Sequence, residues 1–337
     1  SYYTKKNTLL DLGNSGTGLR LISSIISTTP NIEVNFTGDS SLKKRNMSKL
    51  IALLSEFGAE VFPKNTVRLP FKLRSSNFPV GIKYIAGSSA QLKSAAILAA
   101  LNSYGTTTVL EKYKTRDHTE NLLTKNSKSI LFKNKKDIIK ISGKKTLDPL
   151  NIKIPSDPSS AAFYAAICLL NKNSRLKIKN VCVNPKRLGF YNILKKNGAQ
   201  IHIVNRKKIN SEYVGDILIK SSKINFLKTN FSHYLTATDE YPIMFIIAAF
   251  LKGTSKFSGI RELANKESNR IIEMKKILVK LGIKCKSSSD SITINGGKTF
   301  IKRNNFLKIN SLNDHRIAMS CVVLAVCTGL KIIINGF

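Results

Sequence analysis

Five segments of the chain open with polar or small residues and then continue as a long apolar run. They are GNSGTGLRLISSII, SSAQLKSAAILAAL, DPSSAAFYAAICLL, DEYPIMFIIAAF and DHRIAMSCVVLAV, beginning at Gly13, Ser88, Asp157, Asp239 and Asp314. A helix that is apolar nearly all round belongs inside a domain. We therefore predict five buried helices whose polar first turns open onto a shared surface.

A second kind of segment alternates with the first. LLSEFGAEV, ILKKNGAQI and ILVKLGIKC each predict a helix that ends at a glycine and runs into a strand, and LLTKNSKSI puts Asn126 at the same place. Glycine and asparagine tolerate the left-handed conformation that closes a helix. The glycines are Gly58, Gly198 and Gly282. The arginines Arg45, Arg116, Arg187 and Arg270 stand near the expected helix starts.

The alternation recurs at intervals of roughly 70 residues, which is long for a solenoid repeat. Strand-like segments such as NIEVNFTG and RLKIKNVCV lie between the helices. The pattern predicts an α/β fold made of a few βαβ-rich units that close into globular domains. A length of 337 residues favours roughly two such domains.

The charge is strongly positive, with 55 Lys and Arg against 20 Asp and Glu, a net charge of +35. The lysines are spread along the chain without a basic arm, so we interpret them as a solvated surface and predict no nucleic-acid partner. No apolar run reaches the roughly 18 residues of a membrane span, and the start lacks a secretory signal. Five scattered cysteines without a CxxC pair predict reduced thiols, no metal site and a cytoplasmic location.

The stretch GNSGTG admits two interpretations. Its glycines could let backbone N–H groups approach an anion at the start of the following helix. They could equally form a tight turn that only allows the helix to pack closely.

Nine stretches in this order resemble the enolpyruvyl transferase family, and most closely its members that act on shikimate 3-phosphate. They are GNSGTGLRL, GDSSLKKR, SSAQLKSA, TRDHTENLL, PSDPSSAAF, NPKRLGF, TDEYP, NKESNRI and NDHRIAM. The resemblance implies a two-domain inside-out α/β barrel of repeated βαβαββ units, with helix starts facing a cleft between domains. We expect a first domain at 1–154 with two units and a second at 155–337 with three.

The resemblance also implies the chemistry. The enolpyruvyl (carboxyvinyl) group of phosphoenolpyruvate passes to the 5-hydroxyl of shikimate 3-phosphate, with release of phosphate, in the shikimate pathway to chorismate and aromatic amino acids. The reaction needs anchors for phosphates and carboxylates, a base for the hydroxyl and an acid for the vinyl carbon. We expect no metal, no organic cofactor and a monomer.

By resemblance, four residues bind phosphoenolpyruvate: Gly16, Arg45, Arg270 and Arg316. Guanidinium groups suit planar anions because they stay charged and bind them through two hydrogen bonds. The alternative for each arginine is a solvated position on a helix surface. A side chain at Gly16 would crowd the ligand, so glyphosate is expected to inhibit.

For shikimate 3-phosphate the resemblance points to Ser89, Gln91, Thr115, Asp239 and Lys266. The alternative for Ser89 and Asp239 is ordinary capping of the next helix. The catalytic residues are expected to be Asp239, as the base, and Glu267, as proton donor or relay, although the sequence leaves that division open.

Other interpretations remain. By resemblance, the segment lacks the family's N-terminal unit and C-terminal helix, so it could be an inactive fragment or part of a larger multifunctional chain. The related enzyme that uses UDP-N-acetylglucosamine is the nearest alternative. That enzyme usually has a cysteine near the GDSSLKKR stretch, and no cysteine precedes Cys168 here. A basic nucleic-acid-binding protein is an alternative from another class.

Overall fold

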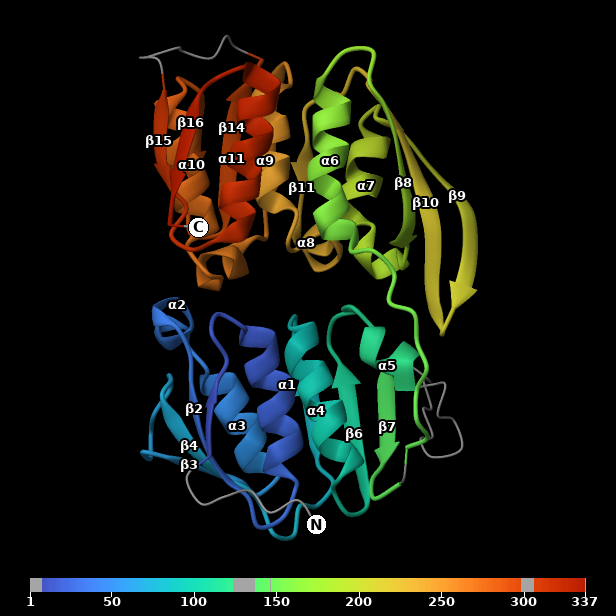
Figure 1. The fold of residues 1–337 in the computed structure, drawn as a ribbon, viewed down its shortest axis with the longest axis vertical. Helices are drawn as coiled ribbons and strands as arrows, with labels where there is room; N and C mark the ends of the chain where they lie inside the picture. The colour runs from blue at the N-terminus through green and yellow to red at the C-terminus, as the bar shows by residue number, and fades with distance from the viewer. Residues whose placement is uncertain (1–7, 124–136, 146, 298–305, 337) are drawn as a thin grey trace. The chain divides into compact units, whose positions relative to one another are not determined.

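The computed structural model describes residues 8–123, 137–145, 147–297 and 306–336. The chain divides into two compact units, unit 1 at Ser1–Ile152 and unit 2 at Lys153–Phe337 (Figure 1). The expected boundary was 154/155. Asn126, the predicted end of one helix, lies outside the described residues.

Unit 1 contains two sheets, each covered by the helices that connect its strands. Its elements are β1 (Thr8–Asp11), α1 (Gly16–Ser27), β2 (Glu33–Thr37), α2 (Ser40–Lys44), α3 (Ser48–Glu56), β3 (Glu60–Phe62), β4 (Phe71–Arg74), β5 (Lys83–Ala86), α4 (Ala90–Leu101), β6 (Thr106–Glu111), α5 (His118–Leu123) and β7 (Ile138–Ser142). The strand orders are β1-β2-β4-β3 and β5-β6-β7.

Unit 2 contains three sheets, and η2 and η3 are short 3-10 helices. Its elements are α6 (Pro158–Leu170), β8 (Arg175–Cys182), η2 (Pro185–Arg187), α7 (Gly189–Lys196), β9 (Gln200–Ile209), β10 (Glu212–Lys220), β11 (Lys228–Thr229), α8 (Phe231–Thr236), α9 (Tyr241–Phe250), β12 (Gly253–Ser258), η3 (Arg261–Asn265), α10 (Arg270–Lys280), β13 (Lys284–Ser287), β14 (Ser291–Gly296), β15 (Leu307–Asn310), α11 (His315–Thr328) and β16 (Ile332–Asn335). The strand orders are β8-β10-β9, β11-β12-β14-β13 and β15-β16.

The same strand pairing recurs in the sheets. In unit 1, β1 is parallel to β2, while β4 is antiparallel to both β2 and β3. In unit 2, β11 is parallel to β12, while β14 is antiparallel to both β12 and β13. A parallel pair needs a crossover, which contains α1 between β1 and β2 and contains α8 and α9 between β11 and β12. The predicted α/β fold of repeated βαβαββ units is confirmed.

The helix ends follow the prediction. Gly58, Gly198 and Gly282 have φ values of +85°, +105° and +81°, which are left-handed conformations that glycine adopts without a steric penalty. Each glycine stands just after a helix and just before a strand.

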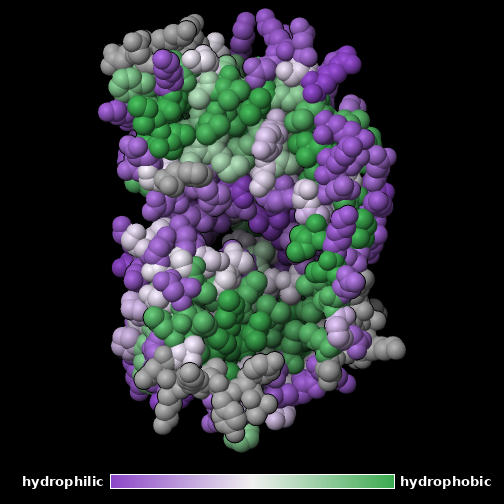
Figure 2. All heavy atoms as spheres, viewed as in Figure 1, coloured by the Kyte–Doolittle hydropathy of each residue, from purple (hydrophilic) through white to green (hydrophobic). Residues whose placement is uncertain are grey.

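The expected burial holds for three of the five apolar helices. The side chains of α9 are buried from Tyr241 to Ala249, and α4 and α6 are buried along most of their length. On α1, in contrast, Ile22 and Ile25 are 38% and 46% exposed. On α11, Val322 and Val326 are 50% and 54% exposed. Figure 2 shows green hydrophobic surface over these two helices, because neighbouring elements cover only one side of each. Among the described helices, none combines the length and the apolar character that a membrane span requires.

Candidate functional site

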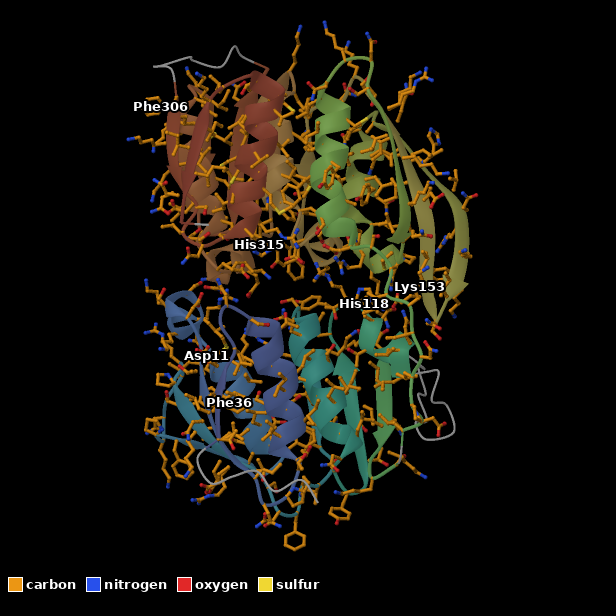
Figure 3. All side chains as sticks on the ribbon, in the orientation of Figure 1. Asp11, Phe36, His118, Lys153, Phe306 and His315 are labelled. Atoms are coloured by element: carbon orange, nitrogen blue, oxygen red, sulfur yellow. The ribbon has the colours of Figure 1, made fainter. Side chains whose placement is uncertain are left out.

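Nine of the ten predicted site residues lie at or just before helix starts, and the tenth, Arg45, is the residue that ends α2, three residues before α3. Unit 1 holds Gly16, Arg45, Ser89, Gln91 and Thr115, and unit 2 holds Asp239, Lys266, Glu267, Arg270 and Arg316. Figure 3 marks two of these helix starts with the labelled residues His118 on α5 and His315 on α11. Helix starts carry partial positive charge and unused N–H groups.

The glycine-rich turn before α1 gathers two guanidinium groups. Arg20 Nη1 donates to the carbonyl oxygen of Gly16 at 2.8 Å, and Arg45 Nη2 donates to Asn14 Oδ1 at 2.5 Å. A Cβ atom added to Gly16 would lie 2.8 Å from Arg45 Nη1 and 2.9 Å from Arg20 Nη1. The hydroxyl of Ser15 caps the helix by accepting from the Gly18 N–H at 2.9 Å. Two cations at a capped helix start favour the anion-binding interpretation of the turn.

The start of α4 is joined to the start of α1. Gln91 Nε2 donates to Thr17 Oγ1 at 2.6 Å. Ser89 is the N-cap of α4 and accepts from the Leu92 N–H at 3.3 Å, so the capping role is confirmed. Accepting that bond does not use the hydroxyl hydrogen, which can still be donated to a ligand.

Thr115 lies in the loop before α5 and is only 3% exposed. Within the part of the chain that the structure describes, its buried hydroxyl oxygen has no hydrogen-bond partner. Buried hydroxyl groups are nearly always hydrogen-bonded, so this one points to a group that is not part of the described chain.

Arg270, the first residue of α10, is the centre of an acidic cluster in unit 2. The guanidinium is buried and donates from Nε to Asp314 Oδ2 at 2.8 Å and from Nη2 to Glu267 Oε2 at 2.6 Å. Its Nη1 lies 3.8 Å from Asp239 Oδ1. Burial alone would lower the pKa of Arg270, but the three carboxylates outweigh it and the pKa is raised. Burial would raise the pKa of Asp314, but Arg270 lowers it.

The cluster leaves one edge of the guanidinium for a ligand. Two of the three nitrogens of Arg270 already bind protein carboxylates, which the sequence did not predict. Among the described residues, no partner lies within hydrogen-bond distance of Nη1. An anion placed there would complete the hydrogen bonding of this buried cation.

Asp314 connects this cluster to α11. It caps α11 by accepting from the Arg316 N–H at 3.0 Å, and it also accepts from Ser268 Oγ at 2.9 Å. The guanidinium of Arg316 stands over the ring of Phe163, 5.9 Å from its centre. Lys266 lies between η3 and α10, next to Glu267.

Asp239 is not the cap of α9, because Glu240 stands between it and the helix. Glu240 is buried and accepts a short hydrogen bond from Ser159 Oγ. Arg187 Nη2 donates to Asp157 at 2.7 Å and to Ser159 Oγ at 2.9 Å. Burial would raise the pKa of Asp157, but Arg187 and the hydrogen bonds lower it. Glu240, the residue after the candidate base Asp239, is thus held to the start of α6 by Ser159.

A family comparison decides among the candidate chemistries. The model of EPSP synthase (3-phosphoshikimate 1-carboxyvinyltransferase) matches residues 1–337. The chain belongs to the EPSP synthase family. Curated 3-phosphoshikimate 1-carboxyvinyltransferases agree: that of Novosphingobium aromaticivorans is 36% identical over 95% of this chain and 74% of its own length. The corresponding protein of Zymomonas mobilis is 38% identical over 93% and 70%.

Solved structures of the EPSP synthase family have the same fold. EPSP synthase from Acinetobacter baumannii superposes with a TM-score of 0.79 at 34% identity, covering 98% of this chain and 75% of that one. The enolpyruvyl transferase NikO from Streptomyces tendae superposes with a TM-score of 0.63 at 11% identity, covering 97% and 89%, which shows the fold alone.

The family membership confirms the prediction of a transferase of the shikimate pathway that acts on phosphoenolpyruvate and shikimate 3-phosphate. It favours this acceptor over UDP-N-acetylglucosamine. Three residues that contact the predicted site were not singled out for it: Arg20, Ser268 and Asp314. The sequence does point to Arg20, because it stands two residues after the glycine-rich turn.

Proposed function

We propose that this chain transfers the enolpyruvyl group of phosphoenolpyruvate to the 5-hydroxyl of shikimate 3-phosphate, with Asp239 and Glu267 moving the protons. The residue assignment is supported by the buried Arg270, whose Nη1 makes no hydrogen bond with the described residues and lies at ion-pair distance, 3.8 Å, from Asp239 Oδ1. A buried cation beside two carboxylates is suited to hold an anionic substrate next to a base and an acid.

Four residues are proposed to bind phosphoenolpyruvate: Gly16, Arg45, Arg270 and Arg316. In unit 1, Arg45 and the start of α1 provide positive charge, and the lack of a side chain at Gly16 lets the guanidinium ends of Arg45 and Arg20 lie against the turn. In unit 2, Arg270 and Arg316 provide guanidinium groups at the starts of α10 and α11. The phosphate and carboxylate of the substrate are the anions that these groups favour.

Shikimate 3-phosphate is assigned to hydroxyl, amide and ammonium groups. Ser89 and Gln91 present theirs at the start of α4, and Thr115 presents a buried hydroxyl without a partner in the described chain. In unit 2, Lys266 adds a positive charge and Asp239 a carboxylate for the substrate hydroxyls.

The proposed reaction has two stages. The 5-oxygen bonds to C2 of phosphoenolpyruvate as Asp239 takes the hydroxyl proton and Glu267 gives a proton to C3. The bond from C2 to the phosphate oxygen then breaks as C3 returns its proton to Glu267 and the double bond re-forms, and the phosphate leaves with the proton that Asp239 took. Arg270 stabilises the negative charge of both carboxylates and of the departing phosphate.

The assignment is tested with Asp239→Asn and Glu267→Gln. General acid–base catalysis contributes about 10²–10⁴-fold, so each variant should lower kcat by at least about 100-fold. Glu273→Gln is the matched control, because Glu273 lies on the same helix α10 as Arg270 and pairs with the exposed Lys276. If Asp239→Asn kept kcat near that of the control, Asp239 would not be the base.

Four further properties are part of the proposal. Glyphosate is proposed to inhibit by competing with phosphoenolpyruvate, and a flat inhibition curve up to millimolar glyphosate would contradict this. The chain is proposed to be a monomer. It is also proposed to lie in the cytoplasm, since its five cysteines form no disulfide among the described residues. Light scattering of the purified protein tests the monomer. The reaction is proposed to need no metal or organic cofactor, so EDTA should leave the rate unchanged.

A further inference from the structure

Helix α5 has very little apolar anchoring. Among its residues His118–Leu123, only Leu123 is fully buried. The described part of α5 has six residues, and a stretch of that length is far too short to be stable by itself in water. Its position, and that of the loop carrying Thr115 before it, must therefore be fixed by other contacts.

Lys93 provides such a contact from inside α4. Its side chain is fully buried, and its Nζ lies 2.8 Å from Glu111 Oε1 at the end of β6 and 2.5 Å from Glu120 Oε1 on α5. The two carboxylate side chains are only 3% and 14% exposed. A second contact runs beside it, as Thr119 Oγ1 donates to Ser94 Oγ at 2.7 Å.

The position of α5 depends on the charges of Lys93 and its two carboxylate partners. A buried ammonium group is costly unless carboxylates and hydrogen bonds surround it. Burial raises the pKa of Glu120, and Lys93 opposes that rise by favouring the ionised carboxylate. Removing the Glu120 charge therefore loosens the link between α4 and α5, whereas Glu111 belongs to a strand that two neighbouring strands already hold.

We propose that Lys93 is a positioning residue that holds α5 through Glu120 and so keeps the Thr115 hydroxyl aligned with Ser89 and Gln91 for the phosphorylated acceptor. Lys93 itself is buried and touches no substrate in this account. The proposal rests on the proposed assignment of shikimate 3-phosphate to these three residues.

The test compares Glu120→Gln with Glu111→Gln in the full chain. Both variants take one negative charge from Lys93, but only Glu120 lies on α5. Glu111 has one further partner, the half-exposed Lys114 at 3.6 Å, and an exposed pair of this kind is worth only about 0–1 kcal/mol. Losing a charge-assisted hydrogen bond there should raise the Kd for shikimate 3-phosphate, measured by calorimetry, by about tenfold or more, while Glu111→Gln should change it by less than about threefold. Hydrogen exchange should accelerate in residues 118–123 of Glu120→Gln and stay unchanged in residues 90–101.

Two results would overturn the proposal. One is unchanged exchange in residues 118–123 of Glu120→Gln, which would mean that Glu120 does not hold α5. The other is faster exchange with an unchanged Kd, which would mean that α5 does not align the site. If the wild-type chain bound no shikimate 3-phosphate, the proposed function would fail and with it the alignment of the site, whereas the exchange data would still show whether Lys93 holds α5.

Discussion

Removing either partner of the buried ion pair between Arg270 and Asp314 should be among the most destabilising single changes in unit 2. Both side chains are at most 2% exposed, and they share hydrogen bonds of 2.8 and 3.2 Å. Removing one partner of a buried pair leaves an uncompensated charge and costs about 3–5 kcal/mol. Arg270→Met should therefore lower the Tm of unit 2 by about 6–20 °C, at about 2–4 °C per kcal/mol.

Asp314→Asn should cost less, near the lower end of about 3–5 kcal/mol, because Glu267 still accepts from the guanidinium. The double variant leaves neither charge buried alone, so its cost should fall short of the sum by at least about 1.5 kcal/mol. Circular dichroism during thermal and urea unfolding gives these values, and the ten tyrosines supply fluorescence in a chain without tryptophan.

The matched control is Lys276→Met, which breaks the pair with Glu273 on the same helix, where the lysine is 62% exposed. An exposed pair is worth about 0–1 kcal/mol, so the control should hardly change the stability. The reasoning is refuted if Arg270→Met costs no more than this control. It is also refuted if the two single variants add to the double variant within about 0.5 kcal/mol.

Three other variants test separate parts of the molecule. Gly16→Ala places a Cβ against two movable guanidinium ends, so the variant should keep the wild-type Tm. It should weaken phosphoenolpyruvate binding, measured by calorimetry, by about 10–100-fold. Unchanged binding would count against the proposed site. Ser159→Ala removes the hydroxyl between Arg187 and the buried Glu240. It should lower the free energy of unfolding, measured in urea, by about 1–3 kcal/mol. A smaller loss would show that the hydrogen bonds among Arg187, Ser159 and Glu240 contribute little to stability. The Asn205 side chain, with the Asn180 N–H and Lys177, lowers the pKa of Asp216 from 3.8 to about 2. The stabilisation by ionised Asp216 is therefore complete above the unfolded pKa and disappears as the pH falls toward 2, so the difference in Tm between wild type and Asp216→Asn should shrink from pH 5 to pH 3. A constant difference would contradict that pKa.

Much of the fold follows from local rules that a sequence displays. Apolar runs preceded by Ser89, Asp157 and Asp314 predicted helices, and each of these residues caps its helix in the structure. Gly58 and Gly282 marked helix ends because the left-handed turn needs them. Such features depend on a few neighbouring residues, so the sequence contains them in full.

The partners inside the site depend on how distant segments pack, and the sequence does not display them. Nothing near Arg270 indicates that Asp314, which follows 44 residues later, occupies two of its hydrogen-bond positions. In the sequence, nothing distinguishes Lys93 from the many other lysines, and only the folded structure shows that it is buried against Glu120. The sequence allowed Asp239 to be the cap of the next helix, but the structure shows that Glu240 occupies the N-cap position of α9.

Phosphate release from phosphoenolpyruvate, with either shikimate 3-phosphate or UDP-N-acetylglucosamine as acceptor, tests the proposed function most directly. We expect release with shikimate 3-phosphate alone, and its loss in Asp239→Asn. Release with UDP-N-acetylglucosamine, or no release with shikimate 3-phosphate, would contradict it.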